Sequence, residues 1–338
     1  MAKVSVIGAG SWGTALAIVL QKNNHNVTVW SIIEDEIKML DEKREHLDKL
    51  PGIKLSEKMM FTTDLEAAIK GKDMIVLAVP SPFIRNTAKN MAPYVAEGQL
   101  IVNVSKGIEE DTLMPLPQII EEEIPQAKVA VLSGPSHAEE VGRGIPTTVV
   151  AGAKKKEIAE FIQEVFMNDT FRVYTSPDML GIELGAALKN VIALAAGMAD
   201  GLGYGDNTKA ALITRGIKEI SRLALAMGAS ADTLSGLSGI GDLIVTCASK
   251  HSRNRKAGML MGQGYTMKEA MTEVKMVVEG VYSAKAAMGL AKKYNVSMPI
   301  IEQVNAVLFD DYPVKDAVVN LMLRDKKTEH EDALWEQE

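Results

Sequence analysis

The chain is almost free of cysteine, with one in 338 residues, so it can form neither an intrachain disulfide nor a cysteine-based metal cluster. Its five histidines are scattered and show no His-x₃-His spacing, and we therefore expect no metal site. So little cysteine suits a reducing compartment, which predicts a cytoplasmic protein.

An excess of positive charge is also absent. Lysine and arginine number 37 against 44 aspartate and glutamate residues, which gives a formal net charge of -7. General binding to nucleic acid or to an anionic membrane surface is therefore not expected. The N-terminus lacks the pattern of a signal peptide. No apolar run approaches the roughly 18 residues that span a bilayer, so we expect no membrane segment.

The length, at about 150 residues per domain, predicts two domains. The first half alternates short β-branched runs with stretches long enough for helices. These runs are continuously apolar, which is typical of strands covered on both faces and predicts a doubly wound parallel α/β sheet. The expected strands are residues 4–7, 27–30, 74–79, 100–104, 129–132, 147–150 and 171–174, with helices at 154–166 and, exposed and amphipathic, at 34–49.

Beyond Pro177 the pattern becomes helical, and no β-branched strand run follows. The proline ends the preceding extended segment, and Asp178 is positioned to cap the next helix. The sequence thus predicts domains at 1–177 (α/β) and 178–325 (all-α), followed by a charged, flexible tail at 326–338. The expected helices are residues 179–198, 207–227, 255–261, 267–274, 281–292 and 300–309.

A glycine-rich loop, Gly8-Ala9-Gly10-Ser11-Trp12-Gly13, follows the first strand and opens a helix at 14–21. Gly8 allows the tight turn, Gly10 lets the backbone approach a pyrophosphate, and Gly13 lets helix and strand pack closely. The helix N-terminus adds free N–H groups and a partial positive charge. In this strand–loop–helix context the motif predicts a Rossmann-type dinucleotide-binding domain.

The choice between NAD and NADP is open. An acid that binds the ribose 2′-hydroxyl, or an arginine that binds a 2′-phosphate, belongs near the end of the second strand. Ser31, Ile32 and Ile33 stand there and offer neither, while Glu34 and Asp35 come slightly late.

Lys189 is a candidate proton donor and acceptor. Its helical neighbours are small and apolar, so burial would depress its pKa unless an anion holds the charge. A snorkelling lysine at a domain surface is an equally good interpretation from this helix alone.

A basic cluster marks a second site. Ser252 is placed to cap a helix that starts near Arg253, where Arg253, Arg255 and Lys256 would crowd a helix N-terminus that disfavours cations. A bound phosphate would resolve that conflict, held by backbone N–H groups, Ser252, Arg253 and Asn254. The alternative is a solvated basic helix start. The single cysteine, Cys247, is expected to be a buried apolar residue rather than a nucleophile.

Two loops follow directly after strands, and ligands of open α/β sheets bind at such ends. Lys106 follows the strand at 100–104, and Gly134 to Ser136 follow the strand at 129–132, so both point into the cofactor crevice. His137 could act as an acid, although a histidine in a loop is more often a bystander.

Over about residues 1–325 the chain resembles the bacterial-type NAD(P)-dependent sn-glycerol-3-phosphate dehydrogenases. The combination is more specific than any single motif. The shared motifs are G-A-G-S-W-G at 8–13, S-K-G-I-E at 105–109, L-S-G-P-S-H-A-E-E-V at 132–141, L-K-N-V-I-A-L-A-A-G at 188–197, G-D-L-I-V-T-C-A-S-K-H-S-R-N-R at 241–255 and V-E-G-V at 278–281.

The resemblance implies an oxidoreductase that converts dihydroxyacetone phosphate and sn-glycerol 3-phosphate into one another and supplies the glycerol phosphate of phospholipids. It implies Lys189 as the proton acceptor. The implied cofactor contacts are Ser11, Trp12, Lys106, Ala138, Arg253, Val277 and Glu279. The implied substrate contacts are Lys106, Gly134, Ser136, Lys189, Asp242, Ser252, Arg253 and Asn254. Family members often carry arginine or histidine where this chain has residues 31–33, which puts a preference for NADPH in doubt.

Two alternatives stay open. A related β-hydroxyacid dehydrogenase would share both domains and the lysine but bind a carboxylate, and the Ser-Arg-Asn cluster favours phosphate over it. A nicotinamide-sensing protein without turnover would not need Lys189.

A homodimer is one way to cover the apolar helical half.

Overall fold

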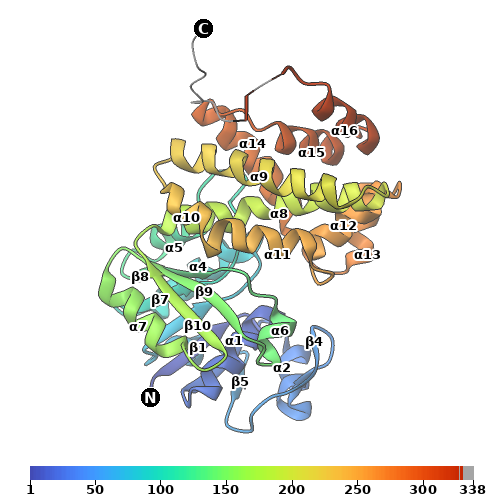
Figure 1. The fold of residues 1–338 in the computed structure, drawn as a ribbon. Coiled ribbons are helices and arrows are strands. Elements are labelled where there is room, and N and C mark those ends of the chain that lie inside the picture. The colour runs from blue at the N-terminus through green and yellow to red at the C-terminus, as the bar shows by residue number, and fades with distance from the viewer. Residues whose placement is uncertain (327, 330–338) are drawn as a thin grey trace.

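The computed structural model describes residues 1–326 and 328–329. An α/β half carries an eight-stranded sheet, and the chain is helical from Met179 onward, with the helices stacked over one end of the sheet (Figure 1). The expected fold class, a doubly wound parallel α/β sheet followed by an all-α half, is confirmed apart from one antiparallel pairing in the sheet.

The main sheet has the strand order β10-β9-β8-β7-β6-β1-β2-β5. Its central strands alternate between two apolar layers. In β6, for example, Met74 and Val76 join the core on one face, whereas Ile75 and Leu77 join the core on the other. The strands are β1 (Lys3–Ile7), β2 (Asn26–Trp30), β5 (Met60–Thr62), β6 (Met74–Leu77), β7 (Leu100–Asn103), β8 (Lys128–Ser133), β9 (Thr147–Ala153) and β10 (Phe171–Ser176).

The sheet is not parallel throughout, because β9 pairs with β8 in the antiparallel sense and β10 then pairs parallel to β9. A parallel crossover must carry the chain back along the sheet, usually through a long helix. The only helix between β8 and β9 is the five-residue α6 (Ala138–Gly142), which packs against α1 (Ser11–Lys22). The chain therefore turns back at the same end of the strands, and β9 runs in the opposite direction to β8.

The remaining elements of this half cover the sheet or follow β2. They are α2 (Glu34–Lys43), β3 (Glu45–His46), β4 (Leu50–Lys54), α3 (Leu65–Ile69), η1 (Ser81–Phe83), α4 (Ile84–Met91), η2 (Ala92–Tyr94), α5 (Leu116–Glu123) and α7 (Lys156–Phe166).

The expected helix at 34–49 is wrong in its second half. The helix α2 ends at Lys43, because Arg44 takes a left-handed conformation with φ of 49°, and a short antiparallel hairpin of β3 and β4 follows. The charge pattern concealed a buried cluster: the Glu36 carboxylate accepts hydrogen bonds from Ser31 at 2.5 Å, from His46 at 3.1 Å and from Lys49.

The helical half is built around α8 (Met179–Gly201), which the Asp178 side chain caps as expected. Glycines let its neighbour α12 approach closely, since a Cβ on Gly197 or Gly258 would overlap the facing backbone. The other helices are α9 (Asp206–Ala226), α10 (Ala231–Ser235), the π-helix η3 (Leu237–Gly241), α11 (Asp242–Ala248), α12 (Arg253–Gly262), α13 (Met267–Val274), α14 (Glu279–Tyr294), α15 (Pro299–Phe309) and α16 (Val314–Met322); of these, α10, η3, α11 and α16 were not predicted.

Contrary to the expectation that no run is long enough to span a bilayer, α8 is long and apolar enough by length and composition. Its 23 residues include a stretch with a mean hydropathy of 1.5, because alanine, leucine and isoleucine outweigh its few polar residues. Within the described chain, however, 94% of that stretch is buried inside the protein. The helix is therefore the centre of the helical core. The expected tail at 326–338 lies largely outside the described residues, which include only 326, 328 and 329 of it.

Candidate functional site

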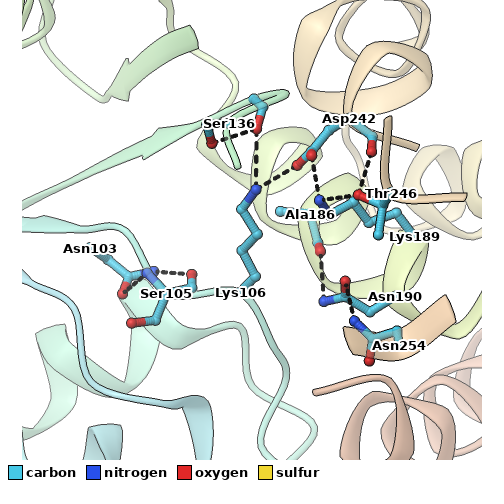
Figure 2. Close-up of polar contacts among 11 residues, drawn as sticks. Asn103, Ser105, Lys106, Ser136, Ala186, Lys189, Asn190, Asp242, Thr246 and Asn254 are labelled. Atoms are coloured by element: carbon cyan, nitrogen blue, oxygen red, sulfur yellow. Dashed lines mark hydrogen bonds and ion pairs between the residues drawn. The ribbon is translucent and has the colours of Figure 1, made fainter. Parts of the chain in front are cut away.

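The candidate site lies where the carboxyl ends of the parallel strands meet the helical half. Lys106 follows β7 and Gly134 follows β8, and the side chain of Lys106 reaches Asp242, the first residue of α11 (Figure 2). The loop beyond Lys106 continues into the other half, since Ile108 is buried in the helical core. The site is thus built from residues of both halves of the chain.

The glycine-rich loop has the backbone shape that dinucleotide binding requires. Gly8 has φ of +115°, and a Cβ there would lie 2.8 Å from the backbone of Ala78. A Cβ on Gly10, in contrast, would meet no atom within 4 Å. Gly10 is the N-cap of α1 and offers no side-chain cap, so the first N–H groups of the helix have no hydrogen-bond partner among the described residues. These features fit a pyrophosphate.

The residues at the end of β2 follow neither of the two patterns considered, an acid for the ribose 2′-hydroxyl or an arginine for a 2′-phosphate. The hydroxyl of Ser31 is turned inward to Glu36, whereas Ile32 and Ile33 are exposed. Hydrogen bonds from His46, Lys49 and Ser31 outweigh burial and lower the pKa of Glu36 to about 2, so this group is an anion. The acid near the second strand is therefore Glu36, which the sequence pattern did not single out.

Asp242, the first residue of α11, joins the two lysines of the site. Its Oδ1 accepts a hydrogen bond from Nζ of Lys189, and its Oδ2 accepts one from Nζ of Lys106 at 2.7 Å (Figure 2). Lys189 also donates to Oγ1 of Thr246 at 2.7 Å, and Lys106 donates to the Gly134 carbonyl at 3.2 Å. Each ammonium group has three hydrogens. One hydrogen of each therefore has no partner among the described residues.

The electrostatics of this cluster are set by burial and by charge. Lys189 is 5% exposed and Asp242 is 1% exposed. Burial lowers the pKa of Lys189 well below its usual range, and nearby Lys106 lowers it further, while Asp242 opposes both effects. The two ammonium groups hold the pKa of Asp242 below its usual range although burial acts in the opposite direction. Lys189 can thus exchange a proton near neutral pH while Asp242 stays charged.

The residues predicted to bind a phosphate lie at the start of α12. The Ser252 hydroxyl caps the helix by accepting from the Arg255 N–H at 3.2 Å, as expected. The expected conflict of cations at this N-terminus is smaller than the sequence suggested, because Nε of Arg255 donates to Asp200 at 2.6 Å. Arg253 is half-buried and its guanidinium forms no hydrogen bond or ion pair with the described residues, so Arg253 is an available cation here, and its charge acts on the nearby Glu279 carboxyl.

Asn254 belongs to a buried amide network. Its Nδ2 donates to Oδ1 of Asn190 at 3.0 Å, and its Oδ1 accepts from the Gly280 N–H at 2.8 Å (Figure 2). Asn190 lies next to Lys189 on α8, and its own amide makes only a long contact of 3.4 Å to the Ala186 carbonyl. Asn190 and Thr246 are thus site residues that sequence reasoning missed, although Thr246 stands one helical turn after Asp242.

The remaining predicted residues form no hydrogen bond with Lys106, Lys189 or Asp242. The Glu279 carboxylate accepts two hydrogen bonds from Ser81, which ties α14 to η1, and burial raises its pKa. The Ser136 hydroxyl donates to the Gly134 carbonyl at 2.9 Å. Ala138 is buried at the start of α6, and Val277 precedes α14. Ser11 and Trp12 begin α1.

Two further residues lie close to the lysine–aspartate cluster. Cys247 is fully buried, as expected, which raises the pKa of its thiol to about 12, and it is therefore inert. Burial lowers the pKa of His137, and the nearby charges of Lys189 and Lys106 lower it further; its ring lies against His251, and its buried Nε2 has no hydrogen-bond partner among the described residues. Among the described residues no group of three or more histidine, cysteine, aspartate or glutamate side chains could hold a metal ion.

Comparison with known proteins identifies relatives over nearly the whole chain. Family models described as the N-terminus and C-terminus of NAD-dependent glycerol-3-phosphate dehydrogenase match residues 3–159 and 178–319. Proteins named glycerol-3-phosphate dehydrogenase [NAD(P)+] are 69% identical in Agathobacter rectalis, over 99% of this chain and 100% of that protein, and 61% identical in Fusobacterium nucleatum, over 97% and 99%.

Solved structures agree with this assignment. A crystal structure of glycerol-3-phosphate dehydrogenase from Coxiella burnetii superimposes with a TM-score of 0.93 at 35% identity, covering 96% of this chain and 99% of that one. A ketopantoate reductase from Ralstonia eutropha shares the fold, with a TM-score of 0.61 over 95% of this chain and 99% of that one, at only 15% identity. On the family models and on these identities, the chain belongs to the NAD(P)-dependent glycerol-3-phosphate dehydrogenase family.

Proposed function

We propose that this protein catalyses the reversible reduction of dihydroxyacetone phosphate to sn-glycerol 3-phosphate. The observation that carries the proposal is the pair of ammonium groups of Lys106 and Lys189, held on the two oxygens of Asp242 with one free hydrogen each. Such a pair can stabilise negative charge that develops on a carbonyl oxygen during reduction.

The cofactor is NAD or NADP, which supplies the hydride when bound. Gly8, Gly10 and Gly13 with Ser11 and Trp12 would hold its pyrophosphate side. The other residues expected to contact the cofactor are Lys106, Ala138, Arg253, Val277 and Glu279.

Proton transfer is assigned to Lys189. In the direction of reduction its ammonium donates a proton to the alkoxide formed at C2, and in the direction of oxidation the neutral amine accepts that proton. Asp242 and Thr246 orient the amine, since both bind its Nζ. Lys106 adds positive charge on the other side of the same carboxylate.

The phosphate of the substrate is assigned to the start of α12. Arg253, Ser252 and Asn254 lie together there, and the free helix N–H groups favour an anion. Gly134 and Ser136 would line the opposite wall. Binding energy from the phosphate, remote from C2, would orient the carbonyl toward the lysines.

The organisation of the chain supports several broader proposals. A division into domains at 1–177 and 178–325 is supported by the end of β10 at Ser176 and the start of α8 at Met179. The family also supports a cytoplasmic enzyme that supplies glycerol phosphate to phospholipid synthesis. A homodimer that covers part of the helical half is a further proposal, which sedimentation of the purified protein tests directly.

The experiment that tests the function is oxidation of NADH and of NADPH, followed at about 340 nm with dihydroxyacetone phosphate as the substrate. Turnover that requires the phosphate supports the proposal. Turnover only of a carboxylate analogue would indicate a β-hydroxyacid dehydrogenase, and cofactor binding without turnover would indicate a sensing protein.

A further inference from the structure

Glu183 is a buried carboxyl group that the proposed reaction does not use. It lies on α8, six residues before Lys189, and is 3% exposed. Its Oε1 accepts a hydrogen bond from Nδ2 of Asn103 at 3.0 Å. Its Oε2 is buried without any partner among the described residues.

These surroundings favour an uncharged acid. Burial raises the pKa of Glu183 to about 8, although the hydrogen bond from Asn103 and the charge of Lys106 oppose that effect. An ionised carboxylate with a single hydrogen-bond donor would be costly at this depth, because most of its lost hydration would have no replacement. A neutral carboxyl needs less compensation.

Asn103 connects this acid to the loop that carries Lys106. It is the last residue of β7, and its Nδ2 donates to the Ser105 carbonyl at 3.0 Å as well as to Glu183. Its Oδ1 accepts from the Ser105 N–H at 3.3 Å, so the asparagine side chain holds the turn that leads to Lys106 (Figure 2). The Ser105 hydroxyl in turn donates to the Val79 carbonyl at 2.5 Å.

The same contact joins the two halves of the site. Lys189 reaches Asp242 from α8, whereas Lys106 reaches it from the loop after β7. The Glu183–Asn103 hydrogen bond links α8, which carries Lys189, directly to the end of β7, from which the loop of Lys106 starts.

We propose that Glu183, as an uncharged carboxylic acid, is a positioning residue that fixes α8 against the end of β7 and so sets the placement of Lys189 relative to Lys106. This inference rests on the proposed function and adds a residue to it. Glu183 touches none of the reacting groups, so its effect on turnover passes through the two lysines.

The test compares two substitutions at this residue. Glu183→Gln keeps an oxygen that accepts from Asn103 and stays uncharged, whereas Glu183→Ala removes the acceptor. We expect kcat to fall by about tenfold to a hundredfold in Glu183→Ala, because misplacement by about 1 Å costs up to that much. The KM for NADH should stay close to the wild-type value, and Glu183→Gln should restore most of kcat.

Glu219→Ala is the matched control. Glu219 is also a buried carboxyl of the helical half with a raised pKa, but it binds the backbone at the start of α15, away from the lysines. Its loss should lower the Tm and leave kcat unchanged. If Glu183→Ala does not fold, Asn103→Ala removes the same hydrogen bond from the other side together with the two that hold the Ser105 turn, and a loss of kcat at least as large is expected there.

Infrared spectroscopy supplies a readout independent of activity. At pH 7 the wild-type protein should show a carbonyl stretch of a buried protonated carboxyl group that is absent from Glu183→Gln. The proposal is overturned if Glu183→Ala and Asn103→Ala keep wild-type kcat, if Glu183→Gln is as slow as Glu183→Ala, or if that infrared band is missing. An inactive wild type would instead refute the proposed function, which these results distinguish from failure of the positioning role.

Discussion

Replacing Asp242 by asparagine tests the central feature of the site. The substitution keeps the shape of the side chain and an oxygen acceptor but removes the charge between Lys106 and Lys189. At the 2.7 Å that separates Oδ2 from Nζ of Lys106, a pair of unit charges is worth about 6 kcal/mol at an effective dielectric constant of about 20. Reorganisation and water entry reduce the measured cost, and buried pairs that lose one partner typically lose about 3–5 kcal/mol of stability.

The same substitution should shift the pH dependence of turnover. Asp242 is the anion that opposes the lowering of the pKa of Lys189. Its loss therefore lowers that pKa further, and the ammonium form needed for reduction disappears at lower pH. Lys189 forms an ion pair of the same kind with the other oxygen of Asp242, and even a quarter of an energy of that size is about 1.5 kcal/mol, or about one pH unit. We expect the alkaline fall of kcat/KM for dihydroxyacetone phosphate to begin at least about one pH unit lower.

The assay is NADH oxidation across a pH series, with thermal unfolding measured on the same samples. Asp200→Asn is the control, because Asp200 is likewise an aspartate that two cations bind, Arg255 at 2.6 Å and Lys209 at 3.0 Å, but it does not contact Lys189. The control should lose stability, while the alkaline fall of its kcat/KM should begin at the same pH as in the wild type. If this fall in Asp242→Asn begins at the wild-type pH or at a higher pH, the assignment of the proton to Lys189 is refuted.

Three other substitutions test the rest of the molecule. Lys189→Ala should bind NADH normally by fluorescence titration but lose turnover by about a hundredfold or more; wild-type turnover would contradict its role. Arg253→Ala should raise the KM for dihydroxyacetone phosphate by about tenfold or more, since a charged hydrogen bond is worth about 1.5–3 kcal/mol, and an unchanged KM would count against the phosphate site. Glu36 has a pKa lowered from 4.5 to about 2, so its ionised form contributes stability above about pH 4.5 that is lost as the pH falls toward 2. Glu36→Gln should therefore be less stable than the wild type by about 2–3 kcal/mol at pH 7 in urea unfolding, and this difference should vanish near pH 2; an equal difference at both pH values would show that ionisation is not the cause.

Much of the fold was predictable because it depends on local patterns. The central strands β1, β2, β6, β7 and β8 are apolar runs buried on both faces, and the glycine-rich loop needs a backbone conformation that few other residues adopt. The change from strands to helices near residue 178 is visible in composition alone. The hairpin of β3 and β4 was missed because its strands are short and polar, and charge spacing in that region imitates a helix.

The candidate site could be predicted in its residues but not in its connections. Lys189, Asp242 and Lys106 each stood out by position or by resemblance, yet no spacing indicates that one carboxylate joins both lysines. That arrangement requires α8, α11 and the end of β7 to meet, and sequence separations of 53 and 136 residues carry no local signal of it.

The sequence by itself determined most of the strands and helices and the glycine-rich loop, because hydrophobic periodicity and glycine act over a few neighbouring residues. Only the tertiary structure decided which charges meet. Several features depend on segments that are distant in the sequence. They are the opposite direction of β9, the partner of Arg255, the anion at the end of β2 and the burial that shifts the pKa values of Lys189 and Glu183. Burial and Coulomb energy are properties of the assembled interior, where water is excluded, and the order of residues along the chain does not contain them.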